Sequence, residues 1–114
     1  MVISQDEKLS QVFRSLSDPT RIQIVRMLSQ GERTVLDLAA NFRMSQPAVT
    51  KHLGVLEKAG VISRTKNGRY RHCRLKTDKM HNAAEWIRKI EDYWNQRLDI
   101  IEGLLEAEQK EKEK

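Results

Sequence analysis

The sequence SQPAVTKHLGVLEKAG, residues 45–60, carries the signals of one helix from its first turn to its last. The Ser45 side chain can accept hydrogen bonds from the free amides of the first turn, and Pro47 stands where no amide partner is needed. The closing glycine favours the end of the helix. An apolar stripe at helical spacing predicts that one face packs on a core, and its members are Val49, Leu53 and Leu56.

The opposite face of this helix carries small, hydrogen-bonding or cationic side chains. Its members are Pro47, Thr50, Lys51, Gly54 and Lys58, with Gln46 at the exposed start, and we expect no carboxylate on it. A helix that enters a DNA major groove needs such a surface. His52 lies nearer the apolar stripe by helical angle, so packing and DNA contact both stay open for it.

The next segment, residues 61–76, contains six lysines or arginines and no acid. Asn67-Gly68 tolerates the positive φ values of a type I′ turn, which predicts a two-stranded hairpin, the wing of a winged helix. Like charges that face each other weaken a hairpin, and a phosphate backbone would explain them. A two-residue loop at Asn67-Gly68 sets the expected register, with Lys66 opposite Arg69, Thr65 opposite Tyr70, Arg64 opposite Arg71 and Ile62 opposite Cys73.

Apolar residues at helical spacing also occur in the part of the chain that precedes residue 45. Residues 6–17 predict a first helix with one apolar face. Asp18 and Pro19 predict the start of a second helix, which buries Ile22, Val25 and Leu28 and keeps Arg21 and Arg26 on its solvent side. Thr34 is the expected cap of a third, and a turn at residues 41–44 completes a helix-turn-helix over residues 34–59.

A long apolar stripe follows the wing, over residues 79–106. One small domain cannot cover so much apolar surface, so we expect a dimer seam, with the first helix beside it; packing on its own domain is the alternative. Residues 107–114 are rich in Glu and Lys and are expected to fray. The predicted dimerisation residues are Leu9, Val12, Phe13, Leu16, Ile87, Ile90, Trp94, Leu98, Ile101 and Leu105.

Length and composition narrow the class of protein. The 114 residues fit a single domain with a net charge of +5, which favours nucleic acid as the partner. A single cysteine excludes an intramolecular disulfide, and no apolar run is long enough for a membrane span, so we expect a cytoplasmic protein without a membrane partner. The three histidines lie on separate elements and no Gly-rich phosphate loop is present, so we expect no enzyme.

Three segments together resemble the ArsR/SmtB family of winged helix-turn-helix repressors. They are Asp18-Pro-Thr-Arg-Ile-Gln-Ile-Val-Arg-Met-Leu, Met44-Ser-Gln-Pro-Ala-Val-Thr-Lys-His-Leu-Gly-Val-Leu-Glu-Lys-Ala-Gly-Val-Ile, and Gly68-Arg-Tyr ending at Arg74-Leu, with Leu38-Ala between the first two. The resemblance implies a homodimer that binds an inverted-repeat operator and represses transcription. It also implies that Gln46, Thr50 and Lys51 lie toward base edges or phosphates, and that Arg69 and Tyr70 lie in the wing.

Many members of that family sense metals, and this sequence departs from them. Their thiol site needs cysteines near the start of the third helix, where this chain has Arg33-Thr-Val-Leu-Asp-Leu. Asp78 and His81 imitate half of the interfacial site of other members, but the second half falls on Glu91, Asp92 and Asn95. We therefore expect no metal and no cofactor, and leave open a small-molecule effector or a redox event at Cys73.

The sequence thus predicts a mainly α fold with a small β-hairpin, namely a winged helix-turn-helix with a long C-terminal dimerisation helix. Its expected function is a homodimeric repressor on double-stranded DNA. The alternatives are a protein-interaction adaptor that uses the long helix, or a metal-sensing repressor with an atypical site. The expected DNA contacts are Ser45, Gln46, Pro47, Thr50, Lys51, His52, Arg64, Lys66, Arg69, Tyr70 and Arg71.

Overall fold

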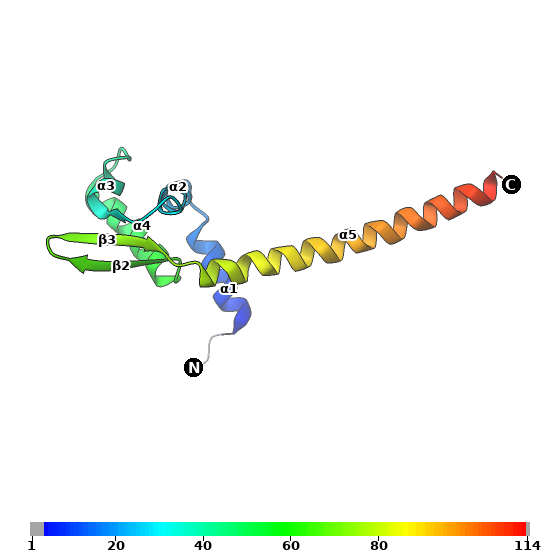
Figure 1. Cartoon of the computed structure of the whole chain (residues 1–114), viewed down its shortest axis with the longest axis horizontal. Helices are drawn as coiled ribbons and strands as arrows, with labels where there is room; N and C mark the ends of the chain where they lie inside the picture. The colour runs from blue at the N-terminus through cyan, green and yellow to red at the C-terminus, as the bar shows by residue number, and fades with distance from the viewer. Residues whose placement is uncertain (1–3, 114) are drawn as a thin grey trace. The chain divides into compact units, whose positions relative to one another are not determined.

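The computed structural model describes residues 4–113 and forms a winged helix-turn-helix (Figure 1). The chain divides into one compact unit that ends at Ala83 and a second unit, from Ala84, that is helix alone. The elements, in chain order, are α1 (Gln5–Ser15), α2 (Pro19–Leu28), β1 (Arg33–Thr34), α3 (Val35–Ala39), α4 (Gln46–Lys58), β2 (Ile62–Asn67), β3 (Tyr70–Leu75) and α5 (Asp78–Lys112).

The expected helix starts are confirmed at atomic detail. Asp18 Oδ2 accepts the backbone N–H of Thr20 at 2.9 Å, and Pro19 opens α2. Thr34 caps α3, and Ser45 caps α4 by accepting from the backbone N–H of Ala48 at 3.2 Å. Each cap satisfies an amide that the first helical turn leaves free, which is why a short local sequence fixes where the helix begins.

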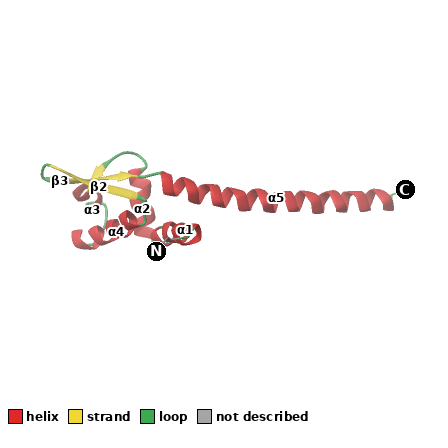
Figure 2. Cartoon of the chain, turned by 90° about the horizontal axis from the view of Figure 1, so that it is seen from below, coloured by secondary structure: helices red, strands yellow, loops and turns green. Residues whose placement is uncertain are grey.

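The sheet contains a strand that the sequence analysis missed. β1 pairs with β3, so the strand order is β1-β3-β2, and the sheet lies along one side of the α1–α4 helices (Figure 2). β1 has only two residues, which is too short for an alternation of apolar and polar side chains to be visible in the sequence. Its strand conformation depends on hydrogen bonding to β3. The wing is therefore anchored to the residues that lead into α3.

The register predicted for the hairpin is wrong by two residues. The two-residue loop is Gly68-Arg69, because Asn67 pairs with Tyr70. Within the hairpin, residues 62–75, a positive φ occurs only at Gly68, at 67°, whereas a type I′ turn at Asn67-Gly68 would need one at both residues. A single glycine at the first loop position is the pattern of a type II′ turn. The observed pairs place Lys66 opposite Arg71, Thr65 opposite His72, Arg64 opposite Cys73 and Ile62 opposite Leu75.

The core unites α1–α4, the base of the wing and the start of α5. Val49, Leu53 and Leu56 of α4 are fully buried, as the stripe predicted. The prediction for α2 is partly wrong: Ile24, Met27 and Leu28 are buried, whereas Ile22 is exposed. Arg21 is not on the solvent side either, because it is half-buried and hydrogen-bonded to the end of α1.

Val12, expected in the dimer seam, lies in the core of its own chain at 2% exposure. A side chain covered by its own fold offers no surface to a second copy, so Val12 drops out of the seam. Leu9, Phe13 and Leu16 are only partly buried and stay candidates.

Helix α5 extends to Lys112, past the end expected at residue 106. The prediction that residues 107–114 fray is therefore wrong up to Lys112, and Lys114 lies outside the described residues. Glu, Lys, Ala and Gln are strong helix formers, and Lys112 pairs with Glu108 one turn earlier at 3.7 Å. No helix within residues 4–113 has the length and apolar character needed to cross a membrane.

Candidate nucleic-acid interface

The apolar stripe of α4 determines which side chains the helix presents outward. With Val49, Leu53 and Leu56 against the core, the side that carries Gln46 and Lys51 faces outward, and both residues are exposed. Pro47 is exposed in the first turn and Thr50 is half-buried. Four of the predicted contacts therefore lie on the polar side or the exposed start of one helix.

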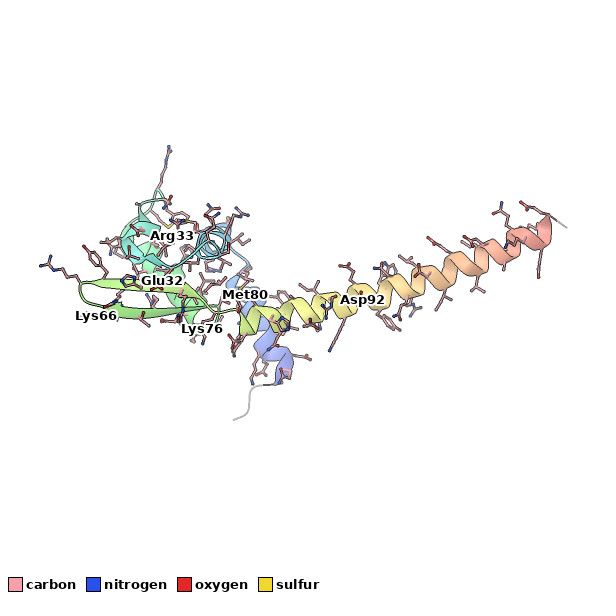
Figure 3. All side chains as sticks on the ribbon, in the orientation of Figure 1. Glu32, Arg33, Lys66, Lys76, Met80 and Asp92 are labelled. Carbon is pink, nitrogen blue, oxygen red and sulfur yellow. The ribbon has the colours of Figure 1, made fainter. Side chains whose placement is uncertain are left out.

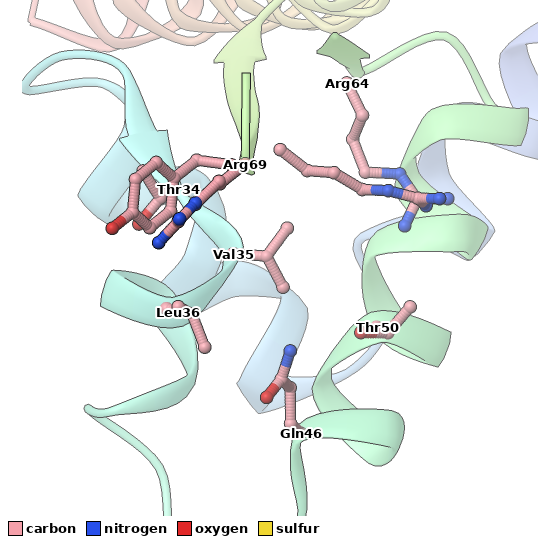
Figure 4. Close-up of a pocket in the computed structure, with 9 residues that line it drawn as sticks. Thr34, Val35, Leu36, Gln46, Thr50, Arg64 and Arg69 are labelled. Carbon is pink, nitrogen blue, oxygen red and sulfur yellow. The ribbon is translucent and has the colours of Figure 1, made fainter. Parts of the chain in front are cut away.

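A hollow of about 300 Å³ joins α4 to the wing and to α3 (Figure 4). Gln46 and Thr50 point into it from α4, while Val35 and Leu36 line it from α3 (Figure 4). The wing, including its loop, contributes the arginine-rich side, which consists of Arg64, Arg69, Tyr70 and Arg71. Polar groups that can read base edges and cations that can neutralise phosphates thus meet in one concave surface.

The wing carries exposed cations toward its tip. Lys66 lies near the tip (Figure 3), and Arg69, Tyr70 and Arg71 are also exposed. Neither of the two expected like-charge pairs forms, and a single new pair, Lys66 opposite Arg71, takes their place. Two cations opposite each other weaken the hairpin unless an anion lies between them, and a phosphate backbone supplies such an anion.

Arg64 differs from the other wing arginines because its charge is already balanced. Its Nη2 and Nε donate to the two carboxylate oxygens of Glu57, at 3.0 and 3.3 Å. This bidentate contact lowers the pKa of the Glu57 carboxyl below its ordinary value. Glu57 follows Thr50 by seven residues, so the expectation of a carboxylate-free face on α4 is wrong. Arg64, which the sequence analysis expected to contact DNA, is therefore a poor candidate for a phosphate contact.

His52 is tied to its own chain. Its Nδ1 lies 3.1 Å from Arg21 Nη1 and 3.8 Å from Asp18 Oδ2, and the side chain is about one quarter exposed. These contacts favour a structural role for the Nδ1 edge of the ring over contact with DNA.

Sequence reasoning missed the contribution of α3 to this surface. Thr34, Val35 and Leu36 line the hollow, and Leu36 is half exposed although its apolar side chain suggests core. The sequence did contain one signal for this contribution, the expected cap at Thr34, which locates the first turn of α3. What the sequence could not supply was the pairing of Thr34 with His72, which brings that turn to the wing.

Residues outside the interface bear on the metal and redox alternatives. Among residues 4–113, no three His, Cys, Asp or Glu side chains are grouped closely enough to hold a metal ion. Cys73 is fully buried between β1 and β2, and burial raises the pKa of its thiol. A buried, protonated thiol is a poor nucleophile, which disfavours a redox role at neutral pH.

Comparison with known proteins places this geometry in a family. The profile of the bacterial regulatory proteins of the arsR family matches residues 18–64. The transcriptional repressor SdpR of Bacillus subtilis (strain 168) is 34% identical over 79 residues, which cover 69% of this chain and 88% of SdpR. The chain belongs to the ArsR family.

Further ArsR relatives agree in sequence and in fold. The arsenical resistance operon repressor of Escherichia coli (strain K12) is 32% identical over 96 residues, which cover 83% of this chain and 80% of that protein. The crystal structure of an ArsR family transcriptional regulator superposes with a TM-score of 0.76 at 33% identity, covering 82% of this chain and 97% of the other. The structure of an ArsR-like transcriptional regulator from Rhodococcus sp. RHA1 superposes with a TM-score of 0.75 at 28% identity, covering 90% of this chain and 96% of the other.

ArsR family proteins are transcriptional regulators that bind double-stranded DNA. The protein is therefore a DNA-binding regulator of transcription, and the surface formed by α4, the start of α3 and the wing is the candidate for that contact.

Proposed function

We propose that this protein is a homodimeric repressor that binds an inverted-repeat operator. Two copies of α4 related by a twofold axis would enter successive major grooves about 34–36 Å apart, one turn of DNA. The relatives that are named as repressors support repression rather than activation. The concave surface that unites Gln46 and Thr50 with the cationic wing carries the proposal.

The exposed stripe of α5 supports the dimer. Its large apolar side chains are between about one third and two thirds exposed in the single chain, and they include Ile87, Ile90, Trp94, Leu98, Ile101 and Leu105. A run of this size on one helix face is typical of an interface between chains. We propose these residues, with Leu9 and Phe13 of α1 and Leu16 directly after it, as the dimer seam.

The proposed contacts divide into two kinds. Lys51, Lys66, Arg69 and Arg71 would neutralise phosphates and supply affinity for any sequence. Gln46 and Thr50 would read base edges, while Ser45, Pro47 and Tyr70 would line the contact. We also propose a release signal other than a metal, because residues 33–38 carry none of the cysteines that a thiol site at this place needs.

Selection of binding sites from random duplexes tests the proposed function. We expect a consensus of two inverted half-sites with centres about 10 base pairs apart, as a twofold dimer requires. Recovery of no consensus, or of a single half-site, would contradict the proposal.

Arg69→Ala is expected to weaken binding to all duplexes alike. Arg69 is an exposed cation in the wing loop, so its loss removes one phosphate contact per protomer and lowers the slope of log affinity against log salt by about one unit for each contact. Titrations between low and moderate salt measure this slope. Arg26→Ala is the matched control, since Arg26 is an exposed arginine of α2 outside the proposed contacts. Equal slopes for Arg69→Ala and Arg26→Ala would contradict the wing contact.

Gln46→Ala is expected to act on sequence discrimination instead. Loss of one side chain that hydrogen-bonds a base edge costs about 1–3 kcal/mol at the base pair it reads and little elsewhere. Site selection with the variant should therefore relax the consensus at one position of each half-site. Gln30→Ala, at an exposed glutamine after α2, should leave the consensus unchanged. An unrelaxed consensus for Gln46→Ala would exclude base readout by Gln46.

A further inference from the structure

The guanidinium of Arg21 joins three helices at one point. Its Nε donates to the backbone carbonyl of Ser15 at 2.6 Å, and its Nη2 lies 3.4 Å from the carbonyl of Arg14. Both carbonyls belong to the last turn of α1, whose final carbonyls have no amide of a following helical turn to accept. The Arg14 carbonyl also accepts the backbone N–H and the hydroxyl of Ser17, so the shorter contact to Ser15 is the main anchor. The rigid fork of the guanidinium therefore has a fixed anchor, and its remaining Nη1 is directed at α4.

The partner of Nη1 is His52 Nδ1, at 3.1 Å. Arginine keeps its proton, so it can only donate, and Nδ1 must be the acceptor. The carboxylate of Asp18 competes poorly for Nδ1, because its Oδ2 is 3.8 Å away and already accepts the backbone N–H groups of Thr20 and Arg21. The contact thus selects the neutral tautomer of His52 that carries its proton on Nε2.

We propose that Arg21 is a positioning residue for the recognition helix and acts through His52 Nδ1. The inference rests on the proposed function, since it assigns to Arg21 the fine placement of the helix that reads the operator. His52 adjoins Lys51 and lies two residues from Thr50, so the hydrogen bond constrains α4 beside its proposed DNA contacts.

This constraint differs in kind from the apolar packing of α4. The buried stripe of Val49, Leu53 and Leu56 fixes which face of the helix turns inward, but apolar contact is non-directional and tolerates small rotations. A hydrogen bond has a preferred length and angle, so it restricts the rotation that packing alone leaves free. Base readout depends on that rotation more strongly than phosphate contact does, because base contacts need defined donor and acceptor positions.

Two isosteric variants of His52 separate positioning from direct DNA contact. In His52→Asn the side-chain oxygen can take the place of Nδ1 and still accept from Arg21. In His52→Gln the polar end instead reaches the place of Nε2, the edge available to DNA. His52→Leu removes both edges, and Arg21→Met removes the donor while it keeps an unbranched side chain.

The experiment measures the affinity of each variant for the duplex recovered by site selection with the parent protein and for a scrambled duplex. We expect His52→Leu and Arg21→Met to lose about tenfold in affinity for the selected duplex and less than about threefold for the scrambled one, with no further loss in the double variant. His52→Asn should stay within about threefold of the parent, and His52→Gln should resemble His52→Leu.

Other outcomes overturn the inference in distinguishable ways. Restoration by Gln rather than Asn would assign His52 to direct DNA contact, and equal loss on both duplexes would reduce Arg21 to a stabilising role. If His52→Leu distinguished the selected duplex from the scrambled one as well as the parent does, positioning through His52 would be excluded, even if Arg21→Met failed to fold. Failure of the parent to select any duplex would instead overturn the proposed function, and the inference with it.

Discussion

Trp94→Glu is expected to weaken operator binding at least about 100-fold and to convert the dimer to a monomer. Trp94 lies in the middle of the apolar stripe of α5 and is more than half exposed in the single chain. In the proposed dimer each copy would bury a carboxylate without a partner, in place of a large aromatic side chain. A monomer engages one half-site only and loses the gain from simultaneous binding of the second. Sedimentation and titration of the selected duplex measure both effects.

Gln96→Glu is the matched control for Trp94→Glu. Gln96 is exposed two residues further along the same helix, roughly opposite the stripe, so the same carboxylate should leave dimer and affinity unchanged. Equal behaviour of the two variants would contradict the seam. A parent that is already monomeric and selects no duplex would favour the adaptor alternative, in which the stripe binds another protein.

Leu53→Ala is expected to lower the free energy of unfolding by about 2–5 kcal/mol. Leu53 is fully buried among α1–α4, and truncation of such a side chain removes apolar contact and leaves a cavity. Urea unfolding followed by circular dichroism measures the change. Parent and variant must be compared at one protein concentration, because dimerisation adds to apparent stability.

The control for this truncation is Val55→Ala, two residues further along the same helix. Val55 is 40% exposed, so its truncation removes less buried surface and should cost less than about 1 kcal/mol. Equal losses for Leu53→Ala and Val55→Ala would show that the stripe does not fix the orientation of α4.

Local chemistry made much of this fold predictable. Asp18, Thr34 and Ser45 satisfy amides within three residues of themselves, and Val49, Leu53 and Leu56 repeat at the helical period, so each signal is complete within one short segment. The fold class and the exposed faces of α4 and α5 followed from these signals. The candidate contacts Gln46, Thr50 and Lys51 followed from them too, and Lys66, Arg69 and Arg71 followed from the positive charge without acid in residues 61–76.

Several predictions that depended on a distant segment of the same chain were wrong or incomplete. The turn residues suggested a hairpin but not its register, because Asn67-Gly68 and Gly68-Arg69 are both compatible with a two-residue loop, and the choice moves every pair. β1 exists only through its pairing with β3. The pairing of Arg64 with Glu57 was missed as well, since Arg64 was expected to contact DNA and the two residues lie on different elements.

The sequence by itself determined where helices begin, which of their faces are apolar and where positive charge collects, because these depend on neighbours within a turn or two. Only the tertiary structure decided that Val12 is buried in its own chain, that Arg64 is neutralised and that Arg21 reaches His52 across 31 positions. Such contacts depend on distances between separate elements, which the packing of the whole core sets.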